Sequence, residues 1–338
     1  MNKQWFSGYP ERLKEEFRAL AKQWHPDTNK SPDANNNFME INTTHKELER
    51  LIENVGIWEG DGRVFLRNED TQQIYNYEYY SCHSFEIGKF FVGSTHVVYV
   101  LSNESLFNNG LRNIKSFTFN SPRMETELRK YLPEIEQTIN LKDGSKAMVI
   151  KKTADQLLLA DVLNFLKINP TVSFSDGHGF VRSDCVPWIL NSLYNLACYL
   201  SFAKLTHNDI SPLTCFISLQ HHSIAILGGW WYAMPMNSPI KIVPKRTFTL
   251  IPNRVKVSKL ADGWTDLECI RDIGRECLGN NIDTKIVPLL NWLKVPSDKL
   301  AILDYEDWQK IVEKCFGKRK FIKTEISEDE IRLTTKKG

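Results

Sequence analysis

The stretch "ERLKEEFRALAKQWHPDTNK", residues 11–30, contains the clearest structural pattern in this chain. Leu13, Phe17 and Trp24 recur at helical spacing, so they share one face of a predicted helix. Pro26 ends that helix, because proline lacks a backbone donor and restricts the residue before it. A second amphipathic run, "ANNNFMEINTTHKELERLI", follows the loop. The pattern predicts two antiparallel helices joined by a loop that contains the tripeptide His-Pro-Asp.

The solvent side of the first predicted helix is basic. Lys14, Arg18 and Lys22 are spaced by four, which aligns them in one stripe. His25 follows at the end of that stripe. A cationic stripe of this kind attracts an acidic surface, speeds encounter and fixes the register of a complex. The hairpin is therefore expected to be a contact site, although a hairpin whose loop merely contains His-Pro-Asp is the plainer alternative.

The basic helix, the His-Pro-Asp loop and the following F-x-x-I-N-x-x-x-x-x-L run together resemble a J-domain, the module of DnaJ-type co-chaperones. The resemblance covers residues 4–55, with a first helix reduced to little more than "QWF". It implies docking on a DnaK-type ATPase chaperone and stimulation of its ATP hydrolysis. The residues that it assigns to partner binding are His25, Pro26, Asp27, Lys14, Arg18 and Lys22.

Composition sets limits on the rest of the chain. The 338 residues are 42% hydrophobic and 25% charged, which is ordinary for a globular protein of two domains. A net charge of +2 gives little reason to expect nucleic-acid binding. The seven cysteines include no C-x-x-C pair, which argues against a zinc knuckle and fits reduced thiols in a cytoplasm. No apolar stretch is long enough to predict a membrane span.

The texture changes after the hairpin. Residues 56–80 are polar and are predicted to be a linker with at most a short strand at "VFL". "SFEIGKFF", "THVVYVLS" and "RNIKSFTF" look like successive strands, and "EIEQTINLKDGSKAMVIKK" like a hairpin. From residue 153 the chain is mostly helical. A small sheet followed by a helical lobe is the predicted order.

The run "LTHNDISPLTCFISLQHHSIAILGGWWYA", residues 205–233, resembles a protein-kinase catalytic loop and the strands after it. The resemblance, over residues 85–320, implies that His207 is structural and that Asp209 is the base for the substrate hydroxyl. In "DGWTDLECIRDIGRECLG", Asp266 would anchor the backbone of the loop. Lys115 in "NIKSF" would pair with ATP, and Glu127 or Glu125 in "METEL" would pair with that lysine. Solvent-facing or structural roles for Asp209 and Lys115 are the alternatives.

Two positions depart from that pattern. The asparagine and the aspartate that should hold metal fall at Thr214 and Gly229. Phosphoryl transfer needs a divalent cation to neutralise developing charge, and magnesium prefers carboxylate oxygens. A glycine has no side-chain ligand to offer. The module is therefore expected to be a pseudokinase, with no metal and no cofactor, although ATP binding without the usual magnesium ligands stays open.

The sequence thus predicts an α+β protein with a small helical hairpin followed by a bilobal protein-kinase-like fold. The expected parts are a J-like domain at 1–55, a linker at 56–80, a small lobe at 81–152, a large lobe at 153–325 and a tail at 326–338. The expected function is a cytoplasmic co-chaperone-like adaptor, of the kind found among bacterial and phage proteins. Its partners would be a DnaK-type chaperone and an unknown protein client, without nucleic acid or membrane. The alternatives are an active atypical kinase that its J-like domain targets, and an interaction protein with neither activity.

Overall fold

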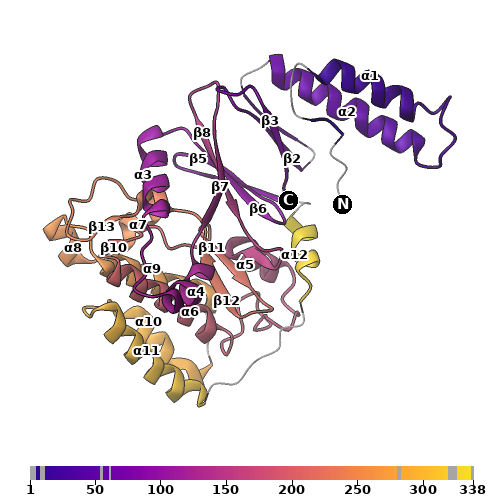
Figure 1. Ribbon diagram of the computed structural model, residues 1–338. Helices are drawn as coiled ribbons and strands as arrows, with labels where there is room; N and C mark the ends of the chain where they lie inside the picture. The colour runs from indigo at the N-terminus through magenta and orange to yellow at the C-terminus, as the bar shows by residue number, and fades with distance from the viewer. Residues whose placement is uncertain are drawn as a thin grey trace. The chain divides into compact units, whose positions relative to one another are not determined.

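The computed structural model describes residues 5–7, 12–53, 56–60, 62–279, 283–318 and 326–335. Helices and strands come mostly in separate runs along the chain, consistent with the predicted α+β class (Figure 1). The chain divides into two compact units. Unit 1 contains Met1–Glu104 and Glu136–Val149, and unit 2 contains Ser105–Ile135 and Ile150–Gly338. This division differs from the predicted boundaries, because the predicted J-like domain and linker share one unit with most of the small-lobe strands.

The helical hairpin of unit 1 consists of α1 (Leu13–Trp24) and α2 (Ala34–Glu53). The two helices lie side by side, as predicted (Figure 1). Ile41 is fully buried and belongs to one apolar cluster with Leu13 and Leu48. Apolar residues spaced along both helices therefore fix the hairpin, as the sequence pattern indicated.

Residues 56–80 are not simply a linker, because a three-stranded antiparallel sheet forms there. Its strands are β1 (Ile57–Gly60), β2 (Arg63–Arg67) and β3 (Ile74–Glu78), in that order. Along β2, Phe65 packs in the hairpin cluster, whereas Val64 and Leu66 pack in a second cluster that contains Phe91 of the larger sheet. Successive strand side chains point to opposite faces. The small sheet is therefore a middle layer between the hairpin and the larger sheet.

The larger sheet has the strand order β4-β5-β6-β8-β7. Its strands are β4 (Ser81–Phe85), β5 (Gly88–Val92), β6 (His96–Leu101), β7 (Glu134–Asn140) and β8 (Lys146–Lys151). Between β6 and β7 the chain forms α3 (Glu104–Lys115), α4 (Pro122–Leu128) and the short helix η2 (Arg129–Tyr131). The prediction of a strand in "RNIKSFTF" is therefore wrong, because the first half of this stretch belongs to α3.

Unit 2 is mostly helical, as predicted for that part of the chain. Its first elements are β9 (Gln156–Leu158), α5 (Leu159–Ile168), α6 (Val186–Phe202), β10 (Leu205–Thr206), β11 (Cys215–Ser218), β12 (Ser223–Ile226), η3 (Trp230–Tyr232) and β13 (Met234–Pro235). They are followed by α7 (Lys245–Leu250), α8 (Asn253–Ser258), α9 (Gly263–Leu278), η4 (Thr284–Ile286), α10 (Val287–Lys294), α11 (Ala301–Phe316) and α12 (Glu328–Thr335). The predicted tail thus contains a helix, α12, which packs on α5 and buries Ile331 completely.

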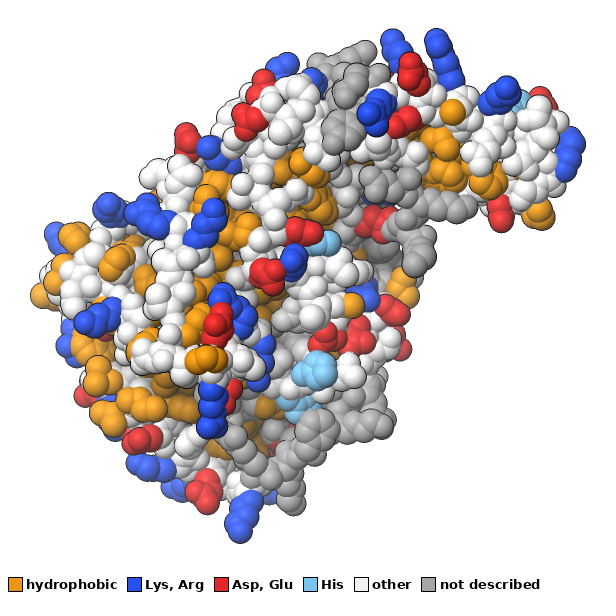
Figure 2. Space-filling view, viewed as in Figure 1, with side chains coloured by type: hydrophobic (Ala, Val, Ile, Leu, Met, Phe, Trp, Pro, Cys, Tyr) orange, Lys and Arg blue, Asp and Glu red, His pale blue; other side chains and the backbone are white. Residues whose placement is uncertain are grey.

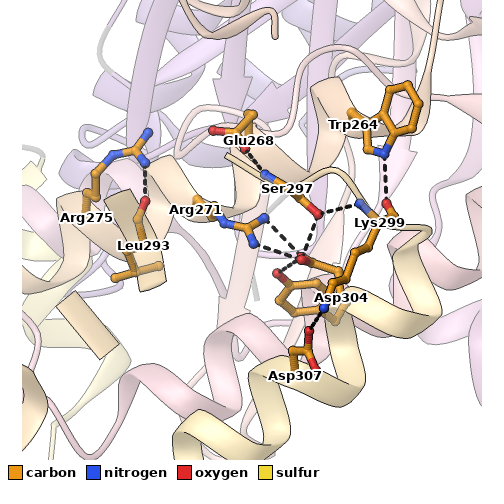
Figure 3. A network of polar contacts seen from close by, with 10 residues as sticks. Trp264, Glu268, Arg271, Arg275, Leu293, Ser297, Lys299, Asp304 and Asp307 are labelled. Atoms are coloured by element: carbon orange, nitrogen blue, oxygen red, sulfur yellow. Dashed lines mark hydrogen bonds and ion pairs between the residues drawn. The ribbon is translucent and has the colours of Figure 1, made fainter. Parts of the chain in front are cut away.

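A buried ion pair joins α9 to α11 (Figure 3). The Arg271 guanidinium donates to both carboxylate oxygens of Asp304, at 3.0 and 2.8 Å. The same carboxylate accepts from the hydroxyls of Tyr194 and Ser297, at 2.6 and 2.7 Å. Both charged side chains are almost inaccessible, with exposures of 3% and 4%. Multiple hydrogen bonds of this kind are what a buried charge needs to offset its lost hydration.

Candidate functional site

The His-Pro-Asp loop begins where α1 ends. His25 has extended backbone angles, and its carbonyl accepts hydrogen bonds from the backbone N–H groups of Thr28 and Asn29, at 3.0 and 2.8 Å. The His25 ring packs edge-on against Phe38 of α2, with ring centroids 5.0 Å apart. Its Nδ1 accepts from the Asp27 backbone N–H at 3.3 Å and lies 3.6 Å from the Asp27 carboxylate. The loop is thus an ordered turn braced from within.

This loop and the adjacent basic stripe are open to solvent. The side chains of His25 and Asp27 are 43% and 85% exposed. Lys14, Arg18 and Lys22 are also exposed on α1. The structure therefore brings the predicted partner-binding residues together on the hairpin and leaves them accessible.

The opposite side of the hairpin is attached to the middle-layer sheet. Arg63 of β2 pairs with Glu40 of α2 at 3.2 Å and donates to the Thr44 hydroxyl at 3.5 Å. The same guanidinium lies 3.8 Å from Glu78 of β3. Phe65 of the same strand adds apolar contacts with the hairpin. These contacts were not expected from the sequence, because residues 56–80 were predicted to be a linker.

The loop at residues 205–214, which the sequence analysis compared with a kinase catalytic loop, lies within unit 2. Asp266 of α9 accepts hydrogen bonds from the backbone N–H groups of His207 and Asn208, both at 2.8 Å, and from the Thr206 hydroxyl at 3.0 Å. The contact expected for Asp266 is therefore present. Burial raises the pKa of this carboxyl to about 6, even though each of the three hydrogen bonds acts to lower it.

His207 is completely buried behind that loop. Its Nε2 lies 3.0 Å from the Gly228 carbonyl, and its Nδ1 accepts from the Asp209 backbone N–H at 3.2 Å. Burial lowers the pKa of His207 to about 3, so the ring is neutral at physiological pH. A neutral ring that accepts at Nδ1 carries its proton on Nε2 and donates it to Gly228. His207 therefore braces two backbone segments.

The two predicted metal positions provide no ligand pair. Gly229 has a φ of +80°, and a Cβ built there would lie 2.6 Å from the His207 ring and 2.9 Å from the Asp209 carboxylate. The Thr214 hydroxyl is used locally, donating to the Asp209 carbonyl at 2.6 Å and accepting from the Ser211 backbone N–H at 3.0 Å. The space that a metal-binding side chain at 229 would need is taken by the loop itself.

The predicted nucleotide-binding pair is not brought together. Lys115 ends α3 as an exposed residue on a helix, not on the strand that the sequence analysis expected. Glu127 is exposed on α4 and pairs with Arg123 at 2.9 Å. Glu125, the alternative, pairs with Arg129. Each carboxylate therefore pairs with an arginine four residues away in the sequence, and neither is bonded to Lys115.

Two asparagines of α3 were missed in the sequence analysis. Asn109 donates to the carbonyls of Trp231 and Ala233, at 2.9 and 2.8 Å. Asn113 donates to those of Trp230 and Ala233, at 3.1 and 2.8 Å. Their i, i+4 spacing on an amphipathic helix is the signal that could have found them. They attach α3 to the segment that follows Gly229.

Across the described ranges, no group of three or more His, Cys, Asp or Glu side chains is arranged to hold a metal ion. The described helices also include none that is both long and apolar enough to cross a membrane.

Comparison with known proteins gives two matches. Residues 9–51 match the family model described as "DnaJ domain". The chain is also 30% identical over 149 residues to "DnaJ homolog subfamily C member 16" of Gallus gallus, in an alignment that covers 42% of this chain. That alignment spans 16% of the relative, so the similarity concerns a small part of the longer protein.

Proposed function

We propose, from the DnaJ domain that residues 9–51 form, that this protein is a co-chaperone-like adaptor for a DnaK-type chaperone. The His25-Pro26-Asp27 loop docks on the chaperone and stimulates its ATP hydrolysis. The larger module transfers no phosphate and holds a protein client or partner. The observation that carries the proposal is an ordered, exposed His-Pro-Asp loop beside an exposed basic stripe.

The attachment of the hairpin supports this proposal. A DnaJ domain implies an Hsp70-type partner, and the hairpin uses its apolar side for the middle-layer sheet. Docking of an acidic partner on the other side therefore leaves the contacts of Phe65 and Arg63 intact. The charges on α1 would steer encounter and set orientation, an effect that weakens as salt rises.

The experiment is single-turnover ATP hydrolysis by a DnaK-type chaperone, with and without this protein. The wild type accelerates hydrolysis, and His25→Gln does not. His178→Gln is the matched control, because it changes an exposed histidine of unit 2 to the same residue. Equal rates with wild type and His25→Gln would refute the co-chaperone function.

Several features support a degenerate kinase-like module. A five-stranded sheet with a helix after its third strand precedes a mostly helical part, in the order that the resemblance implies. Asp266 and His207 brace the loop that contains Asp209. Gly229 packs against Asp209 without a side-chain ligand.

The seven cysteines are all free thiols, which suits the proposed cytoplasmic location.

An active atypical kinase is the second candidate function, because Asp209 is present at the position that the kinase resemblance assigns to the base. It predicts ATP binding that strengthens on adding magnesium and weakens in Lys115→Ala. It also predicts phosphate transfer that Asp209→Asn abolishes. A protein with neither activity predicts no effect on the chaperone and no nucleotide binding, so the two assays separate all three functions.

A further inference from the structure

The segment from Ile240 to Leu260, which contains α7 and α8, has an unusual charge distribution. The sequence has no aspartate or glutamate between Asp209 and Asp262. All the lysines and arginines between residues 209 and 262 fall in the segment Ile240–Leu260. They are Lys241, Lys245, Arg246, Arg254, Lys256 and Lys259. Lys241, Lys256 and Lys259 are exposed, and no carboxylate of the described residues lies within ion-pair distance of them. These three lysines therefore present uncompensated positive charge, although the chain as a whole is close to neutral.

Apolar side chains are exposed among these lysines. Val257 is 84% exposed and Phe248 is 64% exposed, and Ile242 and Leu260 are 43% and 38% exposed. At the left of Figure 2, hydrophobic and basic side chains gather over this part of unit 2. Large side chains exposed together mark an interaction site more often than single ones do.

The segment is a fixed surface and not a loose loop. Thr247 and Val255 are buried beneath α7 and α8, each at 1% exposure. Arg246 pairs with Asp272 and Glu276 of α9, at 2.6 and 2.7 Å. Phe248 and Val257 are thus held outward by neighbours that face the core.

The backbone beside α7 has unused hydrogen-bonding groups. Ile240 donates to the Lys259 carbonyl at 3.0 Å, and Ala261 donates to Ser238 at 2.8 Å. In contrast, among the described residues no hydrogen bond involves the backbone of Lys241, Ile242 or Val243. An extended polypeptide can pair with such groups along its own backbone.

We propose that this basic-apolar surface docks an extended, acidic polypeptide whose apolar residues alternate with Asp or Glu. The inference rests on the proposed function of the larger module and names the chemistry of its partner. Lysines attract the carboxylates, Ile242, Phe248 and Val257 receive the apolar side chains, and the 241–243 backbone pairs with the peptide. A lipid would leave that backbone unpaired, and a nucleic acid would gain little from the exposed apolar side chains.

The test is fluorescence anisotropy with a labelled twelve-residue synthetic peptide in which Glu alternates with Leu and Phe. The wild type binds it, and binding weakens as sodium chloride is raised. Reversal of Lys241, Lys256 and Lys259 to Glu weakens binding by about tenfold or more. The control reverses Lys167, Lys285 and Lys294, which are exposed elsewhere on unit 2, and binds as the wild type does.

Further measurements distinguish the peptide from a lipid or a nucleic acid, and they distinguish this inference from the proposed co-chaperone function. A peptide that is N-methylated at alternate residues should lose binding, because it cannot pair with the 241–243 backbone. The inference is wrong if the control triple variant loses as much affinity, or if the probe does not bind. It is also wrong if phosphatidylserine–phosphatidylcholine vesicles or a single-stranded oligonucleotide bind this surface in preference to the peptide. If His25→Gln still abolishes chaperone stimulation in those cases, the docking inference fails alone.

Discussion

Gly229→Ala is expected to lower the free energy of unfolding of unit 2 by more than the cost of placing a non-glycine residue at a left-handed φ. At a φ of +80°, a non-glycine residue costs about 1–2 kcal/mol. The new Cβ would also lie 2.6 Å from the His207 ring, which hydrogen bonds to Gly228 and Asp209 hold in place. Forcing atoms into such a packed site costs about 1–3 kcal/mol more. The expected loss is therefore about 2–5 kcal/mol.

Gly177→Ala is the matched control. Its φ is +90°, and nothing lies within 4 Å of the added Cβ, so it pays the conformational cost without the clash. Both residues belong to unit 2, which makes urea denaturation followed by tryptophan fluorescence a fair comparison. Equal shifts of the two midpoints, at unchanged m-values, would refute the argument that the loop fills the space at 229.

The same geometry predicts that restoring a carboxylate does not restore a metal site. In Gly229→Asp the new side chain would start within 3.0 Å of Asp209, another carboxylate, so the two charges would repel. We expect no magnesium-dependent rise in thermal stability with ATP, in the wild type or in this variant. A clear magnesium-dependent rise in either protein would overturn the pseudokinase proposal.

Three further predictions concern the fold that supports these sites. Asp304→Ala leaves Arg271 buried without its partner and should cost about 3–5 kcal/mol in urea denaturation (Figure 3). Phe65→Ala should cost about 3–5 kcal/mol and speed hydrogen exchange in α2, because the hairpin cluster loses an almost fully buried contact with the sheet. The third prediction is a pH dependence of the free energy of unfolding. Because the pKa of His207 is lowered in the folded state, this free energy falls as pH drops from about 6.5 towards 3. Because the pKa of Asp266 is raised in the folded state, this carboxyl contributes a partly opposing gain in stability as pH drops from about 6 to 3.8. Asp266→Asn should therefore lose stability more steeply in acid than the wild type, and a shallower loss would contradict these assignments.

The sequence predicted the hairpin because its apolar spacing is local. Leu13 and Ile41 follow the helical period, and the exposed loop between the helices needs few distant contacts. The small sheet was missed because its burial comes from distant segments: Phe65 meets the hairpin while Val64 meets Phe91. The polar residues between its short strands made the segment look like a linker.

The placement of Lys115 failed for a different reason. "RNIKSFTF" alternates as a strand does, but Leu106, Phe107 and Ile114 of α3 follow a helical period that extends into it. A window that began earlier would have favoured the helix. The role of Asp266 came only from the resemblance to a kinase, because no local pattern in the sequence shows which loop this carboxylate reaches; in the structure it accepts from the backbone N–H of His207.

The residues on which the proposed resemblance to a kinase rests are those that the fold itself requires. His207 and Asp266 are fully or almost fully buried polar groups that satisfy backbone donors and acceptors, so removing either leaves buried groups unpaired at about 1–3 kcal/mol each. A metal ligand at Gly229 would satisfy no backbone group, and its side chain would displace the ring of His207. Retention of the first two residues therefore gives no support for phosphoryl transfer, because folding alone accounts for them. Asp209 is the residue that could distinguish a role in folding from a role in phosphoryl transfer. Its carboxylate lies against Gly229, the position at which the resemblance would require a metal ligand.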